Sequence, residues 1–396
     1  MSRDPIVIVS AVRTPLGRFL GELASLQAPQ LGAHVIRAAL ERAKLAPEAV
    51  DEVLFGNVLT AGQGQAPARQ AARAAGLPDA TGATTINKVC GSGMKATFIA
   101  HDILAAGSAE VVVAGGMESM SNAPYLLQRA RAGLRVGHAQ VLDHMLLDGL
   151  EDAYEKGRSM GDFGEATAEA YQFTRADQDA FAVETLTRAR DAIESGAFKA
   201  EIAPISVATK DGEAIVANDE NPLKVVPEKV PKLKPAFRAN GTITAASSSA
   251  NADGAAALVL MRRSLAERSG NPILAEIRAH ATHSQEPAWF TTAPIPAMRK
   301  VLAKAGWSAG DVDLYEVNEA FAAVAMAAQK DLAIPRDRLN VNGGACALGH
   351  PIGATGARLI VTLLHALERQ GATKGIASAC IGGGEATAIA IERVVH

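Results

Sequence analysis

One cysteine of the chain lies in a glycine-rich segment just before a helical pattern. Cys90 is followed by Gly91-Ser92-Gly93, and residues 92–106 are predicted to form a helix. Glycines let a substrate approach the sulfur closely. The N-terminus of a helix lowers the pKa of a thiol and offers free backbone N–H groups to an oxyanion. Cys90 is therefore a candidate nucleophile, although free cysteines are also frequent in protein cores.

Three further segments near the C-terminus carry polar or nucleophilic side chains. His350 lies in a glycine-rich loop, where Pro351 biases it away from helical geometry ahead of a predicted helix at 357–369. Cys380 ends an apolar strand pattern and precedes three glycines, at the edge where open α/β sheets bind ligands. Asn318 follows a short predicted strand and can orient a water or donate a hydrogen bond. These residue types suit covalent catalysis with acid–base assistance.

Two other kinds of site fit parts of the same pattern. Residues 91–96 satisfy the dinucleotide-binding motif G-x-G-x-x-A. That motif comes late in the chain, and Gly115-Gly116 occupies the position of the ribose-binding acid, with Glu118 just beyond. A zinc site formed by the two cysteines and the histidine would lack the clustered spacing of zinc ligands, so we expect no metal there.

Four motifs together resemble the thiolase family. They are Val-Cys-Gly-Ser-Gly at 89–93, Asn-Glu-Ala-Phe-Ala at 318–322, Gly-His-Pro-Ile-Gly at 349–353 and Cys-Ile-Gly-Gly-Gly at 380–384. Their order and separation match those of thiolases over essentially the whole chain, and the resemblance is closest to the acetoacetyl-CoA type. It implies an acetyl-CoA C-acetyltransferase, which reversibly condenses two acetyl-CoA into acetoacetyl-CoA and CoA. A 3-ketoacyl-CoA thiolase of β-oxidation with a broader chain-length range is the alternative.

The resemblance also implies a role for each motif residue. Cys90 attacks the acyl-CoA thioester and holds the acyl group, while His350 accepts the thiol proton and supplies part of an oxyanion site. Cys380 acts as acid and base for the α-proton of the second acetyl-CoA; an unperturbed thiol has a pKa of about 8.5, so modest tuning suffices. Asn318 would hold a water that completes the first oxyanion site, and the amides of Cys90 and Gly382 would form the second. A covalent intermediate implies ping-pong kinetics.

Contacts to coenzyme A follow from the resemblance at single positions. Ser249 matches a serine that contacts pantetheine, and the other expected pocket residues are Met160, Leu150, Ala320, Phe321 and Phe290. The chain departs from the family pattern at Ser247-Ser248, Ser159 and Phe290-Thr291. Five basic side chains either contact the nucleotide phosphates or belong to a solvated loop. They are Lys224, Lys229, Lys232, Lys234 and Arg238. Because the CoA thioesters are substrates, we expect no separate cofactor.

A β-ketoacyl synthase and a non-catalytic lipid- or CoA-binding relative are the remaining alternatives. β-Ketoacyl synthases share the layered fold and a cysteine nucleophile, but they use a second histidine where this chain has Cys380. A non-catalytic relative is expected to have lost a reactive residue, and Cys90, His350 and Cys380 are all present. Cys346 stands where the family usually has an aliphatic residue. We interpret it as a small hydrophobe, with a redox pair to another cysteine as the second hypothesis.

Alternating strand and helix patterns must position these residues. Strands are predicted at 6–10, 51–59, 84–87 and 110–115, with helices at 31–44, 67–75 and 92–106 between them. Such alternation favours a mostly parallel sheet that is covered on both faces. The middle of the chain is richer in charge and turns, with a predicted helix at 178–195 and a polar loop at 210–221.

An internal repeat predicts two similar α/β halves. Residues 36–53 align without gaps on residues 298–315, and Asp51 and Asp313 are one of the identical pairs. Together with the resemblance, this predicts an α/β protein with the layered αβαβα core of the thiolase fold. The expected divisions are an N-terminal half of residues 1–120 plus 249–272, a loop domain of residues 121–248 for coenzyme A and oligomer contacts, and a C-terminal half of residues 273–396.

Composition limits the class of protein and its partners. The 396 residues are 48% hydrophobic with a net charge of −3, and no charge-free apolar run is long enough to span a bilayer. We therefore expect no nucleic-acid and no membrane partner. Three cysteines without a CxxC motif favour a reducing compartment, and residues 1–9 contain no export signal, so we expect a cytoplasmic protein. The family implies a homotetramer or homodimer.

Overall fold

A mixed β-sheet forms the framework of the molecule. The structure, a computed structural model, describes residues 4–210 and 212–395, so residues 1–3 of the segment searched for an export signal lie outside it. Within these ranges, ten strands form one sheet in the order β12-β13-β14-β11-β1-β10-β5-β3-β4, with β2 beside β10. The strands are β1 (Ile6–Arg13), β2 (Gly17–Arg18), β3 (Glu52–Gly56), β4 (Gly82–Ile86), β5 (Val111–Ser119), β10 (Ala252–Arg262), β11 (Ala275–Ser284), β12 (Leu314–Val317), β13 (Lys374–Ile381) and β14 (Glu385–Arg393).

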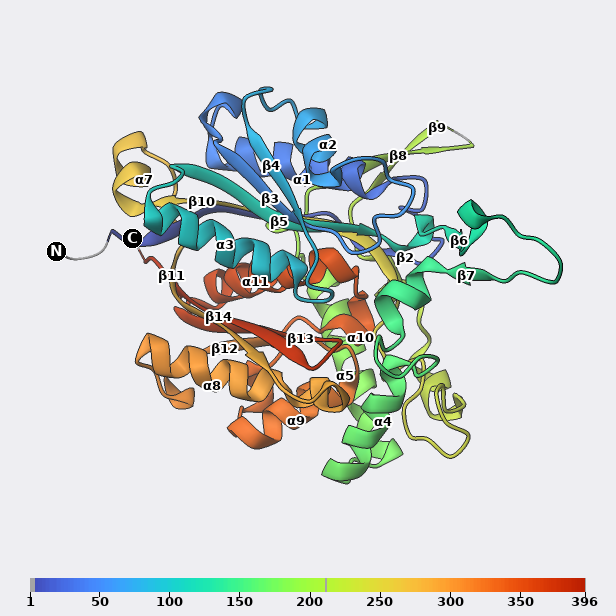
Figure 1. The fold of residues 1–396 in the computed structure, drawn as a ribbon. Helices are drawn as coiled ribbons and strands as arrows, with labels where there is room; N and C mark the ends of the chain where they lie inside the picture. The colour runs from blue at the N-terminus through green and yellow to red at the C-terminus, as the bar shows by residue number, and fades with distance from the viewer. Residues whose placement is uncertain (1–3, 211, 396) are drawn as a thin grey trace.

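Helices divide these strands into five layers (Figure 1). The outer face of the N-terminal strands is covered by α1 (Ala28–Ala43) and α2 (Pro67–Ala74), and the outer face of the C-terminal strands by α8 (Pro294–Ala305) and α9 (Ala322–Leu332). Between the two sets of strands lie α3 (Ser92–Ala106) and α11 (Ile352–Gln370). Separate clusters of buried apolar side chains fill the outer and central interfaces. The predicted αβαβα core is confirmed.

The direction of the strands differs from the prediction of a mostly parallel sheet. Strands β3, β4 and β5 run parallel, as do β12 and β13. The other pairs are antiparallel, because β10 returns beside β5 after a long excursion of the chain and β14 turns back on β13 after a glycine turn. The prediction was wrong because it considered only the βαβ units in the first third of the chain.

The internal repeat corresponds to equivalent elements in the two halves. Helix α1 leads to β3 through one turn of 3₁₀ helix, and α8 leads to β12 in the same way. The carboxylate of Asp51 accepts the amides of Glu110 and Val111, at 2.7 and 3.0 Å, where β5 begins. Asp313 makes the same two bonds, at 2.9 Å each, where β13 begins. The identical aspartates therefore fix the same strand connection in both halves.

The chain between β5 and β10 forms small elements outside the five layers. They are the hairpins β6 (Tyr125–Leu127) with β7 (Val141–Asp143) and β8 (Ile205–Thr209) with β9 (Gly212–Val216), and the helices α4 (Met160–Tyr171), α5 (Arg175–Glu194) and α6 (Glu220–Lys224). The polar loop predicted at 210–221 was wrong, because β9 and the start of α6 lie there; the side chains of β9 are mostly exposed, so this strand lacks apolar alternation.

A buried ion-pair network attaches this middle segment to the sheet. Arg13 in β1 is fully buried and contacts the carboxylates of Glu201, at 2.5 Å, and Asp219, at 2.6 and 2.9 Å. The remaining helices are α7 (Arg263–Ser269) and α10 (Ala345–Leu348). Every helix in the described part of the chain is too short or too polar to cross a membrane.

The two central helices approach each other without room for a side chain at their first turns. A Cβ at Gly356 in α11 would lie 2.4 Å from the backbone nitrogen of Met94 in α3. A Cβ at Gly93 would lie 2.9 Å from the backbone nitrogen of Ala357. Because Cys90 directly precedes α3 and His350 directly precedes α11, this contact determines how far apart the two candidate residues lie.

We expect the substitution Gly356→Ala to lower the free energy of unfolding by about 1–3 kcal/mol, because the added methyl group meets backbone rather than a movable side chain. Gly310→Ala is the matched control, since its Cβ would meet only the Ser308 hydroxyl at 3.8 Å, and a change within about 0.5 kcal/mol is expected. Urea denaturation of both variants measures the difference. Equal stability of the two variants would contradict this account of the contact.

Candidate active site

A strained turn presents Cys90 at the start of α3. Val89 has a φ of 44°, in the left-handed region that β-branched residues rarely adopt. The turn is held by Asn87, whose side chain accepts the Val89 amide at 2.9 Å, and by Ser92, whose hydroxyl donates to the Val89 carbonyl at 2.7 Å. These contacts fix the backbone on both sides of Cys90. The sequence motif did not reveal this strain, because glycine rather than valine is the usual signal for a positive φ.

Burial governs the protonation of the Cys90 sulfur. It raises the pKa of Cys90 to about 11, although the backbone amides of Gly382 and of Cys90 itself hydrogen-bond the sulfur and favour the thiolate. The prediction that the helix N-terminus lowers this pKa was wrong, because desolvation outweighs those amides. The resting Cys90 side chain is therefore a thiol, and it would have to lose its proton to act as a nucleophile. The amides of Cys90 and Gly382, predicted as an oxyanion site, do meet at this sulfur.

The hydrogen bonds of His350 define which ring nitrogen is free. Its Nδ1 lies 2.6 Å from the hydroxyl of Thr355, and that hydroxyl donates to the Pro351 carbonyl at 3.0 Å. A hydroxyl has one proton, so Thr355 must accept from Nδ1–H, which leaves Nε2 unprotonated. Nε2 is buried and has no hydrogen-bond partner among the described residues. His350 thus presents a free basic nitrogen.

Burial also keeps this imidazole uncharged. It lowers the pKa of His350 to about 3, and the positive charge of Arg358 acts in the same direction. The His350 ring is therefore neutral over the pH range in which proteins function, and it can accept a proton at Nε2. A further bond, from the His350 amide to the Ala250 carbonyl at 2.8 Å, ties this loop to the segment that carries Ser249.

Cys380 and Asn318 lie at the ends of neighbouring parallel strands. Cys380 is fully buried near the end of β13, and burial raises its pKa well above the ordinary value, with the charge of Cys90 adding to the effect. The expectation that modest tuning brings this pKa near the working pH was therefore wrong for the free protein. Asn318 follows β12 and is also fully buried, yet neither amide atom of its side chain has a partner in the described part of the chain. Both residues can serve a bound molecule.

A buried carboxylate, Glu118, connects the loops around Cys90. It accepts the amides of Val58, Leu59 and Gly353 at 3.0, 3.1 and 2.9 Å. Burial raises the pKa of Glu118 to about 7 against these bonds, and its charge contributes to the raised pKa of Cys90. Sequence reasoning considered Glu118 only as a poor nucleotide ligand. Its position after a Gly-Gly pair at the end of β5 was the available signal for a site residue.

A cavity of about 660 Å³ reaches His350, whereas Cys90, Cys380 and Asn318 are not part of its lining. It is lined by His350, by the predicted pocket residues Ser249, Met160, Leu150, Ala320 and Phe321, and by Ser159 and Cys346. Lys224, Lys229 and Arg18 line it as well, and Arg18 is a residue that sequence reasoning missed. The middle segment therefore forms one wall of the cavity.

Four predicted binding residues lie elsewhere. Phe290 does not line the cavity; it is buried and packs edge-on against Phe163, with ring centroids 6.2 Å apart. Lys232 and Lys234 are also absent from the lining. Arg238 donates to the Asp162 carbonyl at 2.7 Å, so its guanidinium is engaged within the protein. The Phe290 position follows from the turn after β11, which brings the aromatic ring into the core rather than into the cavity.

The raised pKa of Cys90 has a measurable consequence. An ordinary cysteine stops gaining reactivity with iodoacetamide above its pKa of about 8.5. Because burial raises the pKa of Cys90 to about 11, we expect its alkylation rate to keep rising well beyond that point as the thiolate fraction grows. Mass spectrometry of the Cys90 peptide over a pH series, with N-acetylcysteine as the control, measures this rate. A plateau at or below that of the control would contradict the assignment.

Comparison with known proteins identifies the family of this chain. The model of the thiolase N-terminal domain matches residues 6–264, and the model of the thiolase C-terminal domain matches residues 271–393. An acetyl-CoA acetyltransferase from Pseudomonas aeruginosa is 50% identical over 390 residues, which cover 98% of this chain and 99% of the relative. Acetyl-CoA acetyltransferase 2 from Arabidopsis thaliana is 49% identical, with 98% of this chain and 96% of the relative covered.

Solved structures agree with these sequence relatives. The Acat5 thiolase from Ascaris suum in complex with coenzyme A has a TM-score of 0.94 and 41% identity, covering 98% of this chain and all of the other. The acetyl-CoA acetyltransferase from Bacillus anthracis has a TM-score of 0.96 and 42% identity, covering 99% of both chains. Two domain matches that together span nearly the whole chain, with full-length relatives at this identity, show that the chain belongs to the thiolase family.

Proposed function

We propose that the protein is an acetyl-CoA C-acetyltransferase, which interconverts two acetyl-CoA with acetoacetyl-CoA and CoA. The observation that carries the proposal is the unpaired Nε2 of His350, in a neutral ring that lines the cavity. The names of the full-length relatives support the same activity. The alternative, a 3-ketoacyl-CoA thiolase with a broader chain-length range, uses the same chemistry and differs in the substrates it accepts.

The first half-reaction transfers an acetyl group to Cys90. The sulfur attacks the thioester carbonyl while its proton passes to Nε2 of His350, because a thiol with a raised pKa needs a nearby base. The bond between the carbonyl carbon and the CoA sulfur then breaks, and the proton on His350 passes to the departing CoA. Nε2–H of the protonated ring and the amide of Asn318, through a water, would stabilise the oxyanion of one substrate.

The second half-reaction forms or breaks the carbon–carbon bond. In synthesis, the thiolate form of Cys380 removes the α-proton of a second acetyl-CoA, and the resulting carbanion attacks the acetyl carbonyl on Cys90. The bond between that carbon and the Cys90 sulfur then breaks, and the released Cys90 thiolate takes up a proton as Cys380 gives one back. In thiolysis, the Cys380 thiol gives its proton to the departing acetyl-CoA carbanion. Its raised pKa keeps Cys380 protonated in the free protein, which is the form that thiolysis requires. The amides of Cys90 and Gly382 would hold the oxygen of the Cys90 thioester.

The cavity lining supports a binding mode for coenzyme A. We propose that the apolar side chains of Leu150 and Met160, together with Ser249, contact the pantetheine arm. Lys224, Lys229 and Arg18 supply positive charge on the same cavity for the nucleotide phosphates. The expected division of the chain into halves of 1–120 plus 249–272 and 273–396, with a coenzyme A-binding segment of 121–248 between them, remains part of this proposal.

The surface of the β6–β7 hairpin supports a homo-oligomer. Tyr125 and Val141 on this hairpin are 68% and 62% exposed, and Val136 at its tip is fully exposed. We propose a homodimer or homotetramer in which a second copy covers these apolar side chains. Light scattering distinguishes these states from a monomer. The three free cysteines support function in a reducing compartment, the cytoplasm.

Thiolysis assays test the proposed activity. With acetoacetyl-CoA, we expect Cys90→Ala to lower kcat by at least about 10³-fold, because the covalent step is lost, while the variant still binds CoA and melts as the parent does. For longer 3-ketoacyl-CoAs we expect kcat/KM of the parent to be at least about tenfold lower than for acetoacetyl-CoA. A difference of this size is what an apolar pocket achieves, since it discriminates between chain lengths by about 1–3 kcal/mol.

Each result has a distinct consequence. Full turnover by Cys90→Ala, or no cleavage of any 3-ketoacyl-CoA by the parent, would overturn the reaction itself. Equal cleavage of short and long substrates would instead leave the thiolase chemistry intact and favour the broader-chain alternative. CoA binding by Cys90→Ala is measured first. A variant that no longer binds CoA is misfolded, and its low activity then does not report on the covalent step.

A further inference from the structure

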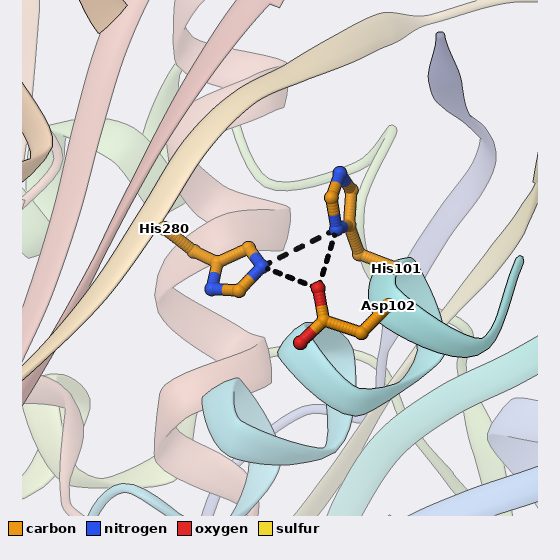
Figure 2. Close-up of side chains that lie close together, drawn as sticks. All are labelled: His101, Asp102 and His280. Atoms are coloured by element: carbon orange, nitrogen blue, oxygen red, sulfur yellow. Dashed lines mark hydrogen bonds and ion pairs between the residues drawn. The ribbon is translucent and has the colours of Figure 1, made fainter. Parts of the chain in front are cut away.

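Two histidines and an aspartate, none of which lines the cavity, converge on one another (Figure 2). His101 and Asp102 lie near the C-terminus of α3, and His280 lies in β11 of the other half. Nδ1 of His101 is 3.0 Å from Oδ1 of Asp102, and Nε2 of His280 is 3.0 Å from the same oxygen. The two ring nitrogens are 3.2 Å apart. The three atoms therefore form a nearly equilateral triangle.

Hydrogen bonds can form along at most two of the three sides of this triangle. Each ring nitrogen carries at most one proton, and the carboxylate oxygen carries none when ionised. If both nitrogens are protonated, both can donate to Asp102, but the two N–H hydrogens are then crowded because their nitrogens are 3.2 Å apart. If only one nitrogen is protonated, its single proton must serve two acceptors, and the remaining side is a contact between two lone pairs. A cation near the centre would attract all three atoms.

The spacing of the three atoms fits a small transition-metal ion. Zinc binds imidazole nitrogen and carboxylate oxygen at about 2.0–2.2 Å in tetrahedral geometry, which places neighbouring ligand atoms about 3.3 Å apart. The observed separations of 3.0–3.2 Å approach this value. The side chain of Asp102 is 58% exposed, so solvent can reach a fourth position. Imidazole and carboxylate are suitable ligands for ions of this class.

The charges and packing around the three residues favour metal binding. The Asp102 carboxylate lies 3.0 Å from a nitrogen of each ring and supplies negative charge beside both. Phe98 stacks on the His280 ring, with centroids 4.5 Å apart, and fixes its orientation.

We propose that Nδ1 of His101, Oδ1 of Asp102 and Nε2 of His280 bind one divalent transition-metal ion of the Zn²⁺ class, with a water in the fourth position. This site joins α3 to β11 and so connects the N-terminal and C-terminal halves. Its role is structural, since none of the three side chains lines the cavity among the described residues. The ion stabilises the folded chain without taking part in acyl transfer.

Titration with Zn²⁺ against a chromophoric chelator tests the site. Cys90 is first blocked with iodoacetamide, so that its thiol does not compete for the metal. We expect one Zn²⁺ per chain in the parent, and an affinity at least about tenfold lower in Asp102→Asn and in His280→Gln. His283→Gln is the matched control on the same strand; its ring contacts Gln285 rather than the triangle, and we expect the parent's affinity.

Two further readouts show which atoms bind the ion. Co²⁺ in the site should show visible d–d bands without a sulfur-to-cobalt charge-transfer band, and Zn²⁺ should raise the melting temperature of the parent and the His283→Gln control only. Equal Zn²⁺ affinity in the parent, Asp102→Asn and His280→Gln would overturn the proposal. A sulfur-to-cobalt band, or the absence of any bound Zn²⁺ in the parent, would also overturn it. Asp102→Asn is exposed and isosteric, so misfolding does not obscure these outcomes.

Discussion

Direct contact between the backbones of α3 and α11 is the constraint on which the candidate site depends. Gly93 and Gly356 let the first turns of the two helices touch, and any larger residue would push them apart. Each helix begins directly after a reactive residue, so the contact brings the Cys90 turn and the His350 loop together. Glu118 reinforces it from β5, because its carboxylate holds the amide of Gly353 in the first turn of α11. The layered core therefore acts as a rigid support for two short loops from distant parts of the chain.

Burial gives this site its chemical character. Desolvation raises the pKa of Cys90 and Cys380 and lowers the pKa of His350, so the free protein holds two thiols and a neutral base. Neither the two thiols nor the imidazole carries a charge in the free protein, so the proposed attack by Cys90 requires a proton transfer. The amides of Cys90 and Gly382 offset part of the desolvation at the sulfur, and the same amides can receive a thioester oxygen. Low polarity and a few directed hydrogen bonds thus act together.

The sequence predicted the layers better than it predicted the strand directions or the pKa values of the candidate residues. Asp51 and Asp313 repeat because they make equivalent bonds to β5 and β13, so the duplication was visible in the residues themselves. The strand directions were not visible, because β10 pairs with strands far away along the chain, and β14 turns back on β13 and also pairs with the distant β11. Phe290 was misplaced, and the pKa of Cys90 was given the wrong direction, because burial depends on the whole fold. The His101, Asp102 and His280 triangle joins residues from both halves, and no local pattern indicated it.

The central claim is that Thr355 orients a neutral His350 to accept the proton of Cys90, and single-turnover acetylation tests it most directly. The parent, Thr355→Ser and Thr355→Val are mixed with acetyl-CoA, quenched, and analysed by mass spectrometry of the Cys90 peptide. Serine retains the hydroxyl that accepts Nδ1–H, so we expect acetyl-Cys90 to form at nearly the parent's rate. Valine removes it, and we expect a rate about 10–100-fold lower. Acetylation of Thr355→Val at the parent's rate, or an acetyl group on another residue, would contradict the account.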